Sequence, residues 1–219
     1  MKGYFITLEG PDGSGKSTVA SKICELLTKD GFEVVHTREP GGIEIAEQIR
    51  NVILDPKNTA MDAKTEALLY AASRRQHLVE RVLPAVQQEK IVICERFIDS
   101  SLAYQGFGRQ IGMEEVLSIN LFAIDNTYPD MTIYLDVDEK VGLDRLKDRE
   151  FKDRLDQESI DFHHRVKDGY QKVLEKFKDR ITIVDASKPL DEVVENTYKV
   201  ILGLINGNRW FKTKWANCL

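Results

Sequence analysis

Short apolar runs alternate with amphipathic segments along most of the chain. Five of these runs predict β-strands, because they are short and rich in β-branched and aromatic residues. They are Tyr4–Leu8, Phe32–Val35, Ile91–Cys94, Met131–Leu135 and Ile181–Val184. An unbroken apolar run such as Ile91–Cys94 is typical of a strand buried on both faces, in a parallel sheet covered by helices.

The segments between these runs carry apolar residues at helical spacing. The predicted helices are Ser17–Leu27, Ile43–Leu54, Lys64–Val86, a short one near Ser101, Met113–Ile124, Val141–Leu146, Ile160–Phe177 and Leu190–Leu204. Pro84 predicts a kink or break in the longest of them. Strands that alternate with helices from end to end predict an α/β fold with a doubly wound, five-stranded parallel sheet.

No repeat, linker or low-complexity tract divides the sequence. We therefore expect one domain over residues 1–205, followed by a C-terminal tail over residues 206–219. The tail carries Trp210, Phe211 and Trp215 among basic residues. We interpret it as a surface terminus, in preference to a partner-binding segment.

The charge and composition exclude several functional classes. The 219 residues include 31 basic and 36 acidic side chains, for a net charge of −5. Nucleic-acid binding needs clustered basic charge, so we expect no nucleic-acid partner and only local basic residues around any anionic ligand. We find no apolar leader and no apolar run that could span a membrane. Cys24, Cys94 and Cys218 form no metal-binding pattern, and their odd number favours a reducing, cytoplasmic location.

A phosphate-binding loop follows the first strand. The segment from Gly10 to Ser17 matches the P-loop pattern G-x-x-x-x-G-K-[ST] at every fixed position, between a strand and a helix. Glycines let backbone N–H groups turn toward phosphate oxygens, and the helix N-terminus favours the anion. We expect Lys16 to face solvent in the empty site and to neutralise the β- and γ-phosphates of ATP, with Ser17 as a ligand of Mg²⁺. The expected ATP-binding residues are Gly10, Pro11, Asp12, Gly13, Ser14, Gly15, Lys16, Ser17 and Thr18.

Three further clusters lie where a doubly wound sheet places its ligands, beyond the carboxyl ends of the strands. Arg38–Gly42 follows the second strand, Glu95–Phe97 follows the third, and Leu68–Arg74 lies on the long helix. The two arginines at strand ends suit a second phosphate, since a guanidinium can bond two phosphate oxygens. Tyr70 and Arg74 are four residues apart, share a helix face and suit a nucleobase. Taken singly, each of these residues also fits an ordinary ion pair or core position.

Taken together, these clusters resemble the thymidylate kinase family from about Tyr4 to Leu204. The resemblance rests on the P-loop, Arg38–Gly42, Leu69–Arg74, Glu95–Arg96, Asp99–Gly106, Arg154–Glu158 and Asp185–Ser187. It implies a P-loop kinase fold of the bacterial type, with the charged segment at about 145–156 as a lid. It also implies transfer of the γ-phosphoryl group of ATP to dTMP for dTTP synthesis, with Mg²⁺ as cofactor, in a homodimer.

The resemblance assigns roles in the acceptor site by position. Arg38 and Arg96 would clamp the dTMP phosphate. Tyr70 would stack on thymine, and Arg74 would bond its O4 atom.

Further positions complete this assignment. Ser101 and Gln105 would face the base, and Asp12 would accept a hydrogen bond from the sugar 3′-hydroxyl. Tyr104 would lie where a ribose carries its 2′-hydroxyl, and the loop at Asp185–Lys188 would cradle adenine.

The catalytic assignment depends on Gly13. One branch of the family has a basic residue at this P-loop position, whereas the branch with glycine supplies arginine from the lid. The expected catalytic residues are Lys16, Arg96, Arg145, Arg149 and Arg154. Ser17 and Glu95 are the expected metal ligands, although the family usually has Asp in place of Glu95.

Two other functions remain open from the residues alone. A kinase for deoxynucleosides or other nucleoside monophosphates is one, because deoxynucleoside kinases use a similar Glu-Arg pair; the Arg38 loop argues against a nucleoside, which has no phosphate to clamp. A P-loop switch that controls a partner is the other, and it would need no acceptor pocket. The N-K-x-D motif typical of GTPases is missing from the sequence.

Overall fold

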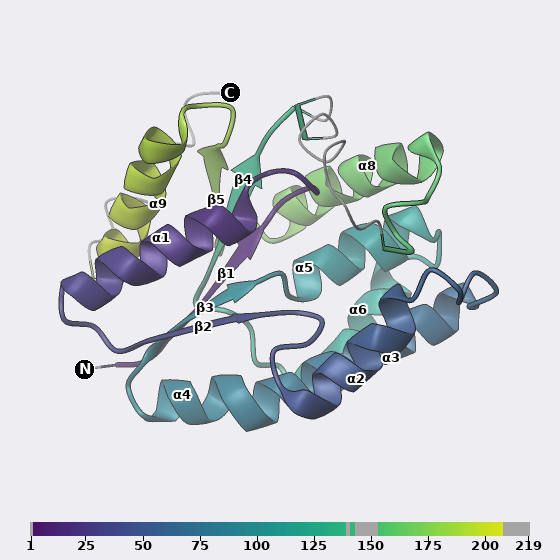
Figure 1. Ribbon diagram of the computed structural model, residues 1–219, viewed down its shortest axis with the longest axis horizontal. Coiled ribbons are helices and arrows are strands. Elements are labelled where there is room, and N and C mark those ends of the chain that lie inside the picture. The colour runs from purple at the N-terminus through teal and green to yellow at the C-terminus, as the bar shows by residue number, and fades with distance from the viewer. Residues whose placement is uncertain (1, 139–140, 143–152, 208–219) are drawn as a thin grey trace.

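The computed structural model describes residues 2–138, 141–142 and 153–207, and five parallel strands form its centre (Figure 1). The strands are β1 (Tyr4–Glu9), β2 (Val34–Arg38), β3 (Ile91–Glu95), β4 (Met131–Asp136) and β5 (Ile181–Asp185). Their order across the sheet is β2-β3-β1-β4-β5. The predicted α/β fold with a five-stranded parallel sheet is confirmed.

Helices connect the strands and cover both faces of the sheet. They are α1 (Lys16–Lys29), α2 (Glu44–Leu54), α3 (Ala63–His77), α4 (Leu83–Gln87), α5 (Ile98–Ser101), α6 (Met113–Ile124), α8 (Ile160–Lys176) and α9 (Leu190–Ile205). Two wider π-helical segments, η1 (Leu78–Val82) and η2 (Leu102–Gly108), continue α3 and α5. Of the predicted helix Val141–Leu146, only residues 141 and 142 are described, and both are helical.

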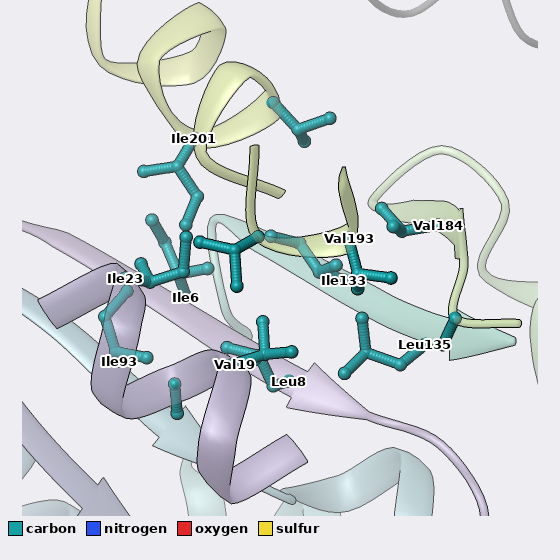
Figure 2. Packing of buried hydrophobic residues seen from close by; sticks show 14 of the residues in the cluster. Ile6, Leu8, Val19, Ile23, Ile93, Ile133, Leu135, Val184, Val193 and Ile201 are labelled. Carbon is teal, nitrogen blue, oxygen red and sulfur yellow. The ribbon is translucent and has the colours of Figure 1, made fainter. Parts of the chain in front are cut away.

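The strands alternate their side chains between two cores, as the period of two requires. In β1, Ile6 and Leu8 face the core under α1 and α9, whereas Phe5 faces the core under α4, α5 and α6. Figure 2 shows the first core, with Ile6, Leu8, Val19, Ile23, Ile93, Ile133, Leu135, Val184, Val193 and Ile201 labelled. Each fully buried aliphatic side chain contributes about 1.5–3 kcal/mol. This packing fixes the ends of the strands that carry the polar residues.

One predicted feature is wrong. The second strand begins at Val34 and continues to Arg38, because β2 pairs in parallel register with β3 as far as Glu95. Arg38 therefore ends a strand, and the loop begins after it.

The long predicted helix is interrupted next to Pro84. The π-helical segment η1 separates α3 from α4, and Pro84 lies in the first turn of α4, where its missing N–H is tolerated.

The carboxyl ends of β1, β2 and β3 bring Gly10, Arg38 and Arg96 to one edge of the sheet. Glu9, at the end of β1, fixes the backbone that follows β3 at this edge. It is fully buried, and its carboxylate accepts hydrogen bonds from the backbone N–H groups of Phe97 and Ser100, at 2.7 and 3.2 Å. None of the described helices is both long and apolar enough to cross a bilayer.

Candidate functional site

A cavity of about 490 Å³ opens at this edge of the sheet. Every residue that the sequence assigns to the acceptor lines it: Asp12, Arg38, Tyr70, Arg74, Arg96, Ser101, Tyr104 and Gln105. So do Gly13, Gly15, Lys16, Ser17, Thr18 and Glu95. The remaining predicted P-loop residues, Gly10, Pro11 and Ser14, do not line this cavity, and neither does Arg154. Arg145 and Arg149 lie outside the described residues.

The P-loop wraps the N-terminus of α1. Gly15 precedes the helix with a φ of 86°, in the left-handed region that favours glycine. The N–H groups of the first helical turn have no partner within the helix, so they and the helix dipole suit a phosphate. A side chain at Gly13 would place its Cβ 2.1 Å from the carbonyl oxygen of Gly142. This close approach agrees with a P-loop that carries no basic residue at that position.

Lys16 does not face solvent, so that expectation is wrong. Its side chain is only 8% exposed, and its ammonium group donates to the carbonyl oxygens of Pro11 at 2.8 Å and Gly10 at 3.1 Å. Burial and the nearby Arg96 guanidinium lower the pKa of Lys16 to about 7. The lysine is therefore folded back on its own loop. A nearby anion would raise the pKa of Lys16 and favour its charged form.

Ser17 and Glu95 lie together beside Lys16. The Ser17 hydroxyl donates to Glu95 Oε2 at 2.5 Å, and His36 Nε2 lies 3.0 Å from Glu95 Oε1. Burial acts to raise the pKa of Glu95, but the hydrogen bonds from His36 and Ser17 outweigh it and keep that pKa below its ordinary value. A hydroxyl and an ionised carboxylate are the hard oxygen donors that Mg²⁺ prefers, so this pair fits that cation.

Arg96 lies between the P-loop and the acceptor side of the cavity. Its guanidinium pairs with Asp12, which also accepts a hydrogen bond from the Tyr104 hydroxyl at 2.6 Å. Burial acts to raise the pKa of Asp12, but Arg96 and Lys16 outweigh it and hold that pKa well below its ordinary value. Arg96 also has a φ of 65°, which is uncommon for a residue other than glycine and often marks a functional position.

Arg38 and Arg50 add positive charge to the same wall of the cavity. Arg38 donates to Glu47 at 2.7 Å, and Glu47 also accepts the N–H of Gly42 at the same distance. Burial and the neighbouring Arg38 lower the pKa of Arg50, as expected where cations gather. Together with Arg96, this wall is suited to a dianionic phosphate.

Arg74 is the largest of the fully buried side chains, at 2% exposed, yet it lines the cavity. Its Nε donates to Glu39 at 2.7 Å, and Nη1 donates to Ser101 at 3.0 Å and to Asn120. Its Nη2 donates to the Phe97 carbonyl at 2.9 Å. A guanidinium has five N–H groups, so these four bonds leave one Nη2 hydrogen for a ligand.

His77 supports the carboxylate that holds Arg74. Its Nδ1 lies 2.8 Å from Glu39 Oε1, and its Nε2 lies 2.6 Å from the Thr37 hydroxyl. Cys94 is buried beside this pair, and the three residues are close enough to bind a metal ion. Both oxygens of Glu39 and both nitrogens of His77 are already bonded, so we interpret the cluster as the support of Arg74.

A second buried carboxylate, Glu66, lies one helical turn before Tyr70 on α3. It accepts hydrogen bonds from Gln105 at 2.8 Å, from Arg109 at 3.1 and 3.2 Å and from Arg154 at 2.5 Å. The Nε of Arg154 also donates to the Ile53 carbonyl at 2.8 Å. The structure therefore places Arg154 in a buried ion pair that joins the end of the charged segment to α2 and α3.

Sequence reasoning missed several residues of the site. These are the cavity-lining Glu39, Pro40, Arg50, Leu54, Ser100, Asp153, Leu155 and Asp156, and the supporting residues Glu9, Glu66, His77 and Tyr170. Most of them fall within motifs or amphipathic helices that a sequence pattern explains without a ligand. The one available signal was Glu66, since a carboxylate four residues before Tyr70 and eight before Arg74 shares their helix face.

The arrangement can hold two phosphate groups and a planar ring. The P-loop can bind one phosphate. Arg38, Arg50 and Arg96, which we call the arginine wall, can bind a second. Tyr70 and Arg74 offer an aromatic ring and a hydrogen-bond donor to a planar ligand. The loop at Asp185–Lys188 lies at the carboxyl end of β5, and Ser187 donates its N–H to Asp185 there at 2.9 Å. It does not line the cavity.

Comparisons with known proteins point to one family. A family model described as thymidylate kinase matches residues 8–197. A thymidylate kinase from Geobacillus sp. (strain WCH70) is 55% identical over 210 residues, which cover 94% of this chain and 100% of the relative. One from Clostridium novyi (strain NT) is 57% identical over 196 residues, covering 89% and 96%. A crystal structure of thymidylate kinase from Ehrlichia chaffeensis matches with a TM-score of 0.76 and 34% identity, covering 92% of this chain and 99% of that one.

We expect ATP binding to depend on pH, because burial and Arg96 lower the pKa of Lys16 to about 7. At pH 8.5, we expect ATP binding to be accompanied by uptake of about one proton, because phosphate oxygens restore the ordinary, higher pKa of Lys16. ATP affinity should therefore fall as the pH rises above 7. Isothermal titration calorimetry in buffers of different ionisation enthalpy measures the proton count. The variant Lys16→Met should show no such uptake and should lose nearly all phosphoryl transfer; equal uptake in both proteins would contradict the assignment.

Proposed function

The chain belongs to the thymidylate kinase family, and from that membership we propose how its residues carry out the reaction. The chain is an ATP-dependent kinase that phosphorylates dTMP to dTDP. We place this reaction in the synthesis of dTTP, in the cytoplasm. The observation that carries the residue assignment is the convergence of the P-loop, the arginine wall and Arg74 on one cavity.

ATP occupies the P-loop from Gly10 to Thr18. Its β- and γ-phosphates replace the loop carbonyls as partners of the Lys16 ammonium group, and the first turn of α1 faces them. Ser17 and Glu95 would hold Mg²⁺, and the bound ion would offset charge on the β- and γ-phosphates. The 2.5 Å contact between these two side chains supports this assignment, because it brings two oxygen donors to one point beside Lys16.

dTMP occupies the other end of the cavity. Its phosphate lies between Arg38 and Arg96, and thymine lies against Tyr70 with O4 at the remaining Nη2 hydrogen of Arg74. What supports this placement is that the other donors of Arg74 are already used by the protein.

The sugar lies between the phosphate and the base. Asp12 accepts from its 3′-hydroxyl, and the neighbouring Tyr104 ring leaves no room for a 2′-hydroxyl. The hydrogen bond between these two side chains supports the placement, because it orients both of them toward one edge of the cavity.

The chemistry requires no covalent intermediate and no strong general base. A phosphate oxygen of dTMP forms a bond to the γ-phosphorus while the bond from that phosphorus to the β,γ-bridging oxygen breaks, and ADP leaves. Lys16, Arg96 and one arginine of the lid neutralise the charge on the transferred group. Among the lid arginines Arg145, Arg149 and Arg154, the last must release Glu66 before it can act in this way.

Two rival functions fit the site less well. A deoxynucleoside kinase would leave Arg38 and Arg50 without an anion to bind. A P-loop switch needs no acceptor, so the cavity lined by Tyr70 and Arg74 would have no ligand. The measurement that separates these readings is ADP release with and without each acceptor.

A homodimer is the assembly that we propose. Its interface is the outer surface of α2, α3 and α6, which lie side by side (Figure 1). Large apolar side chains are exposed there: Phe122 is 92% exposed on α6, Leu68 is 56% exposed on α3, and Ile45 and Val52 are about half exposed on α2. A Phe side chain exposed to this degree is better explained by a partner than by solvent.

The acceptor series tests the function. We expect dTMP to be the best acceptor and dUMP the next, because loss of the methyl group costs about 0.8 kcal/mol, or about fourfold. dCMP should be much poorer, since its amino group meets the Arg74 donor, and UMP should be poor because of its 2′-hydroxyl. Thymidine should be inactive. Coupled assays of ADP release measure the order; a preference for thymidine over dTMP would support a nucleoside kinase instead.

Substitution of the lid arginines tests the catalytic assignment. We expect Arg149→Ala or Arg154→Ala to lower kcat by about a hundredfold and to change the KM for dTMP little, because the charge is needed on the transferred group. Arg154→Ala should also lower Tm, since it leaves Glu66 with one cationic partner fewer. Steady-state kinetics and thermal unfolding check both effects. A raised KM at unchanged kcat would place these arginines in the acceptor site.

Charge at Phe122 tests the interface. Phe122→Glu should raise the dissociation constant of the dimer by at least about tenfold, because a two-fold interface loses the buried ring twice. Ile160→Glu is the matched control, since Ile160 is 68% exposed on α8, away from the proposed interface. Sedimentation equilibrium measures both variants. The interface is misplaced if Phe122→Glu dimerises like the control.

A further inference from the structure

Glu66 is a buried carboxylate that the reaction does not use. It is 0% exposed and does not line the cavity, yet it is bonded to Gln105, which does. Burial acts to raise the pKa of Glu66, but the hydrogen bonds from Arg109, Gln105 and Arg154 outweigh it and lower that pKa. The side chain is therefore ionised, and an ionised carboxylate accepts hydrogen bonds but donates none.

This restriction fixes the orientation of the Gln105 amide. A glutamine amide has a donor end and an acceptor end of nearly the same shape, so its neighbours decide which end points where. Because Glu66 can only accept, Gln105 must turn its Nε2 toward Glu66, as the 2.8 Å bond records. Gln105 lines the cavity, so with Nε2 turned toward Glu66 its carbonyl oxygen, Oε1, is the acceptor that this side chain can offer to a ligand there.

A carbonyl oxygen at this place distinguishes two kinds of pyrimidine. Thymine and uracil carry a hydrogen on N3, which donates to an acceptor. Cytosine has a lone pair at N3, which repels one. Arg74 and Gln105 both line the cavity, one with a donor and the other with an acceptor, and this pair complements O4 and N3–H of thymine and opposes both groups of cytosine.

We propose that Glu66 is a positioning residue for base selection: by orienting the Gln105 amide, it makes the site choose thymine over cytosine. The proposal rests on the proposed dTMP kinase function and deepens it. Glu66 itself touches no substrate and acts through Gln105. Its other bonds, to Arg109 and Arg154, offset the cost of burying the charged carboxylate.

Glu66→Gln should reverse the amide. Arg109 and Arg154 only donate; Arg109 bonds both oxygens of Glu66 but Arg154 bonds Oε2 alone, so the new oxygen is drawn to the Oε2 position. The new amino group then takes the Oε1 position and meets Nε2 of Gln105 donor to donor. The side-chain amide of Gln105 relieves this repulsion by rotating through 180°. An N–H group of Gln105 then lies where its carbonyl oxygen was.

The experiment is competition between dTMP, dUMP and dCMP in one reaction, so that the amount of folded enzyme cancels. Glu66→Gln should lower the dTMP-to-dCMP ratio of kcat/KM by about tenfold to a hundredfold, the effect of one mismatched buried hydrogen bond. The dTMP-to-dUMP ratio should stay within about twofold, because both bases carry N3–H and O4. Glu66→Asp keeps an acceptor-only group and should keep the wild-type preference.

A charge-balanced pair of variants guards against misfolding. Glu66→Gln removes the negative charge that Arg109 and Arg154 share. A double variant, Glu66→Gln with Arg109→Gln, restores the balance of charge and is compared with Arg109→Gln alone. Arg109 does not line the cavity, and the single variant should keep the wild-type ratios. The double variant should show the same loss of discrimination as Glu66→Gln.

The outcomes separate the two proposals. If the wild-type protein shows no ADP release that depends on dTMP, the proposed function fails. If the wild type prefers dTMP and the Glu66→Gln variants lose activity equally on all three nucleotides, Glu66 only holds the fold and the present proposal is overturned. An unchanged dTMP-to-dCMP ratio overturns it as well.

Discussion

The structure depends on carboxylates that each hold one edge of an arginine in the site. A guanidinium keeps a hydrogen directed at a ligand only if its other donors are fixed. Glu39 fixes Arg74, Asp12 fixes Arg96 and Glu47 fixes Arg38. Removal of one partner from a buried pair typically costs about 3–5 kcal/mol, which applies to Arg74 and Glu39, whereas the exposed pair of Arg38 and Glu47 contributes much less.

These pairs also join the two halves of acceptor binding. The segment from Arg38 to Gly42 supplies Arg38 to the proposed phosphate site and Glu39 as the partner of Arg74 at the proposed base site, and Glu47 joins Gly42 to Arg38. The hydrogen bonds from Thr37 to His77 and from His77 to Glu39 anchor this loop to α3. A displacement of the loop would therefore move the phosphate contact and the base contact together.

The sequence predicted the scaffold and which acceptor residues line the cavity, and it failed where tertiary pairing decides. The P-loop and the five strands have local signatures, and every acceptor residue assigned by resemblance lines the cavity. β2 runs to Arg38 because β3 offers it partners, which the sequence of β2 alone cannot show. Lys16 is folded onto its loop because two loop carbonyls accept from it, and Arg50 and Glu66 enter the site through helix packing that periodicity explains as well without a ligand.

The crowding of positive charge explains how two anions can meet in a protein whose net charge is −5. Arg96 lies close enough to Lys16 to lower its pKa, so these two cations already repel each other. The carboxylates of Asp12, Glu39 and Glu66 offset the burial of the arginines beside them. When the phosphates of ATP and dTMP meet in the proposed reaction, the cations that offset their repulsion are already gathered, and only Lys16 and Arg154 must exchange their partners. Flexible surface lysines would have to become ordered around the phosphates during the reaction, and the loss of their side-chain entropy would oppose it.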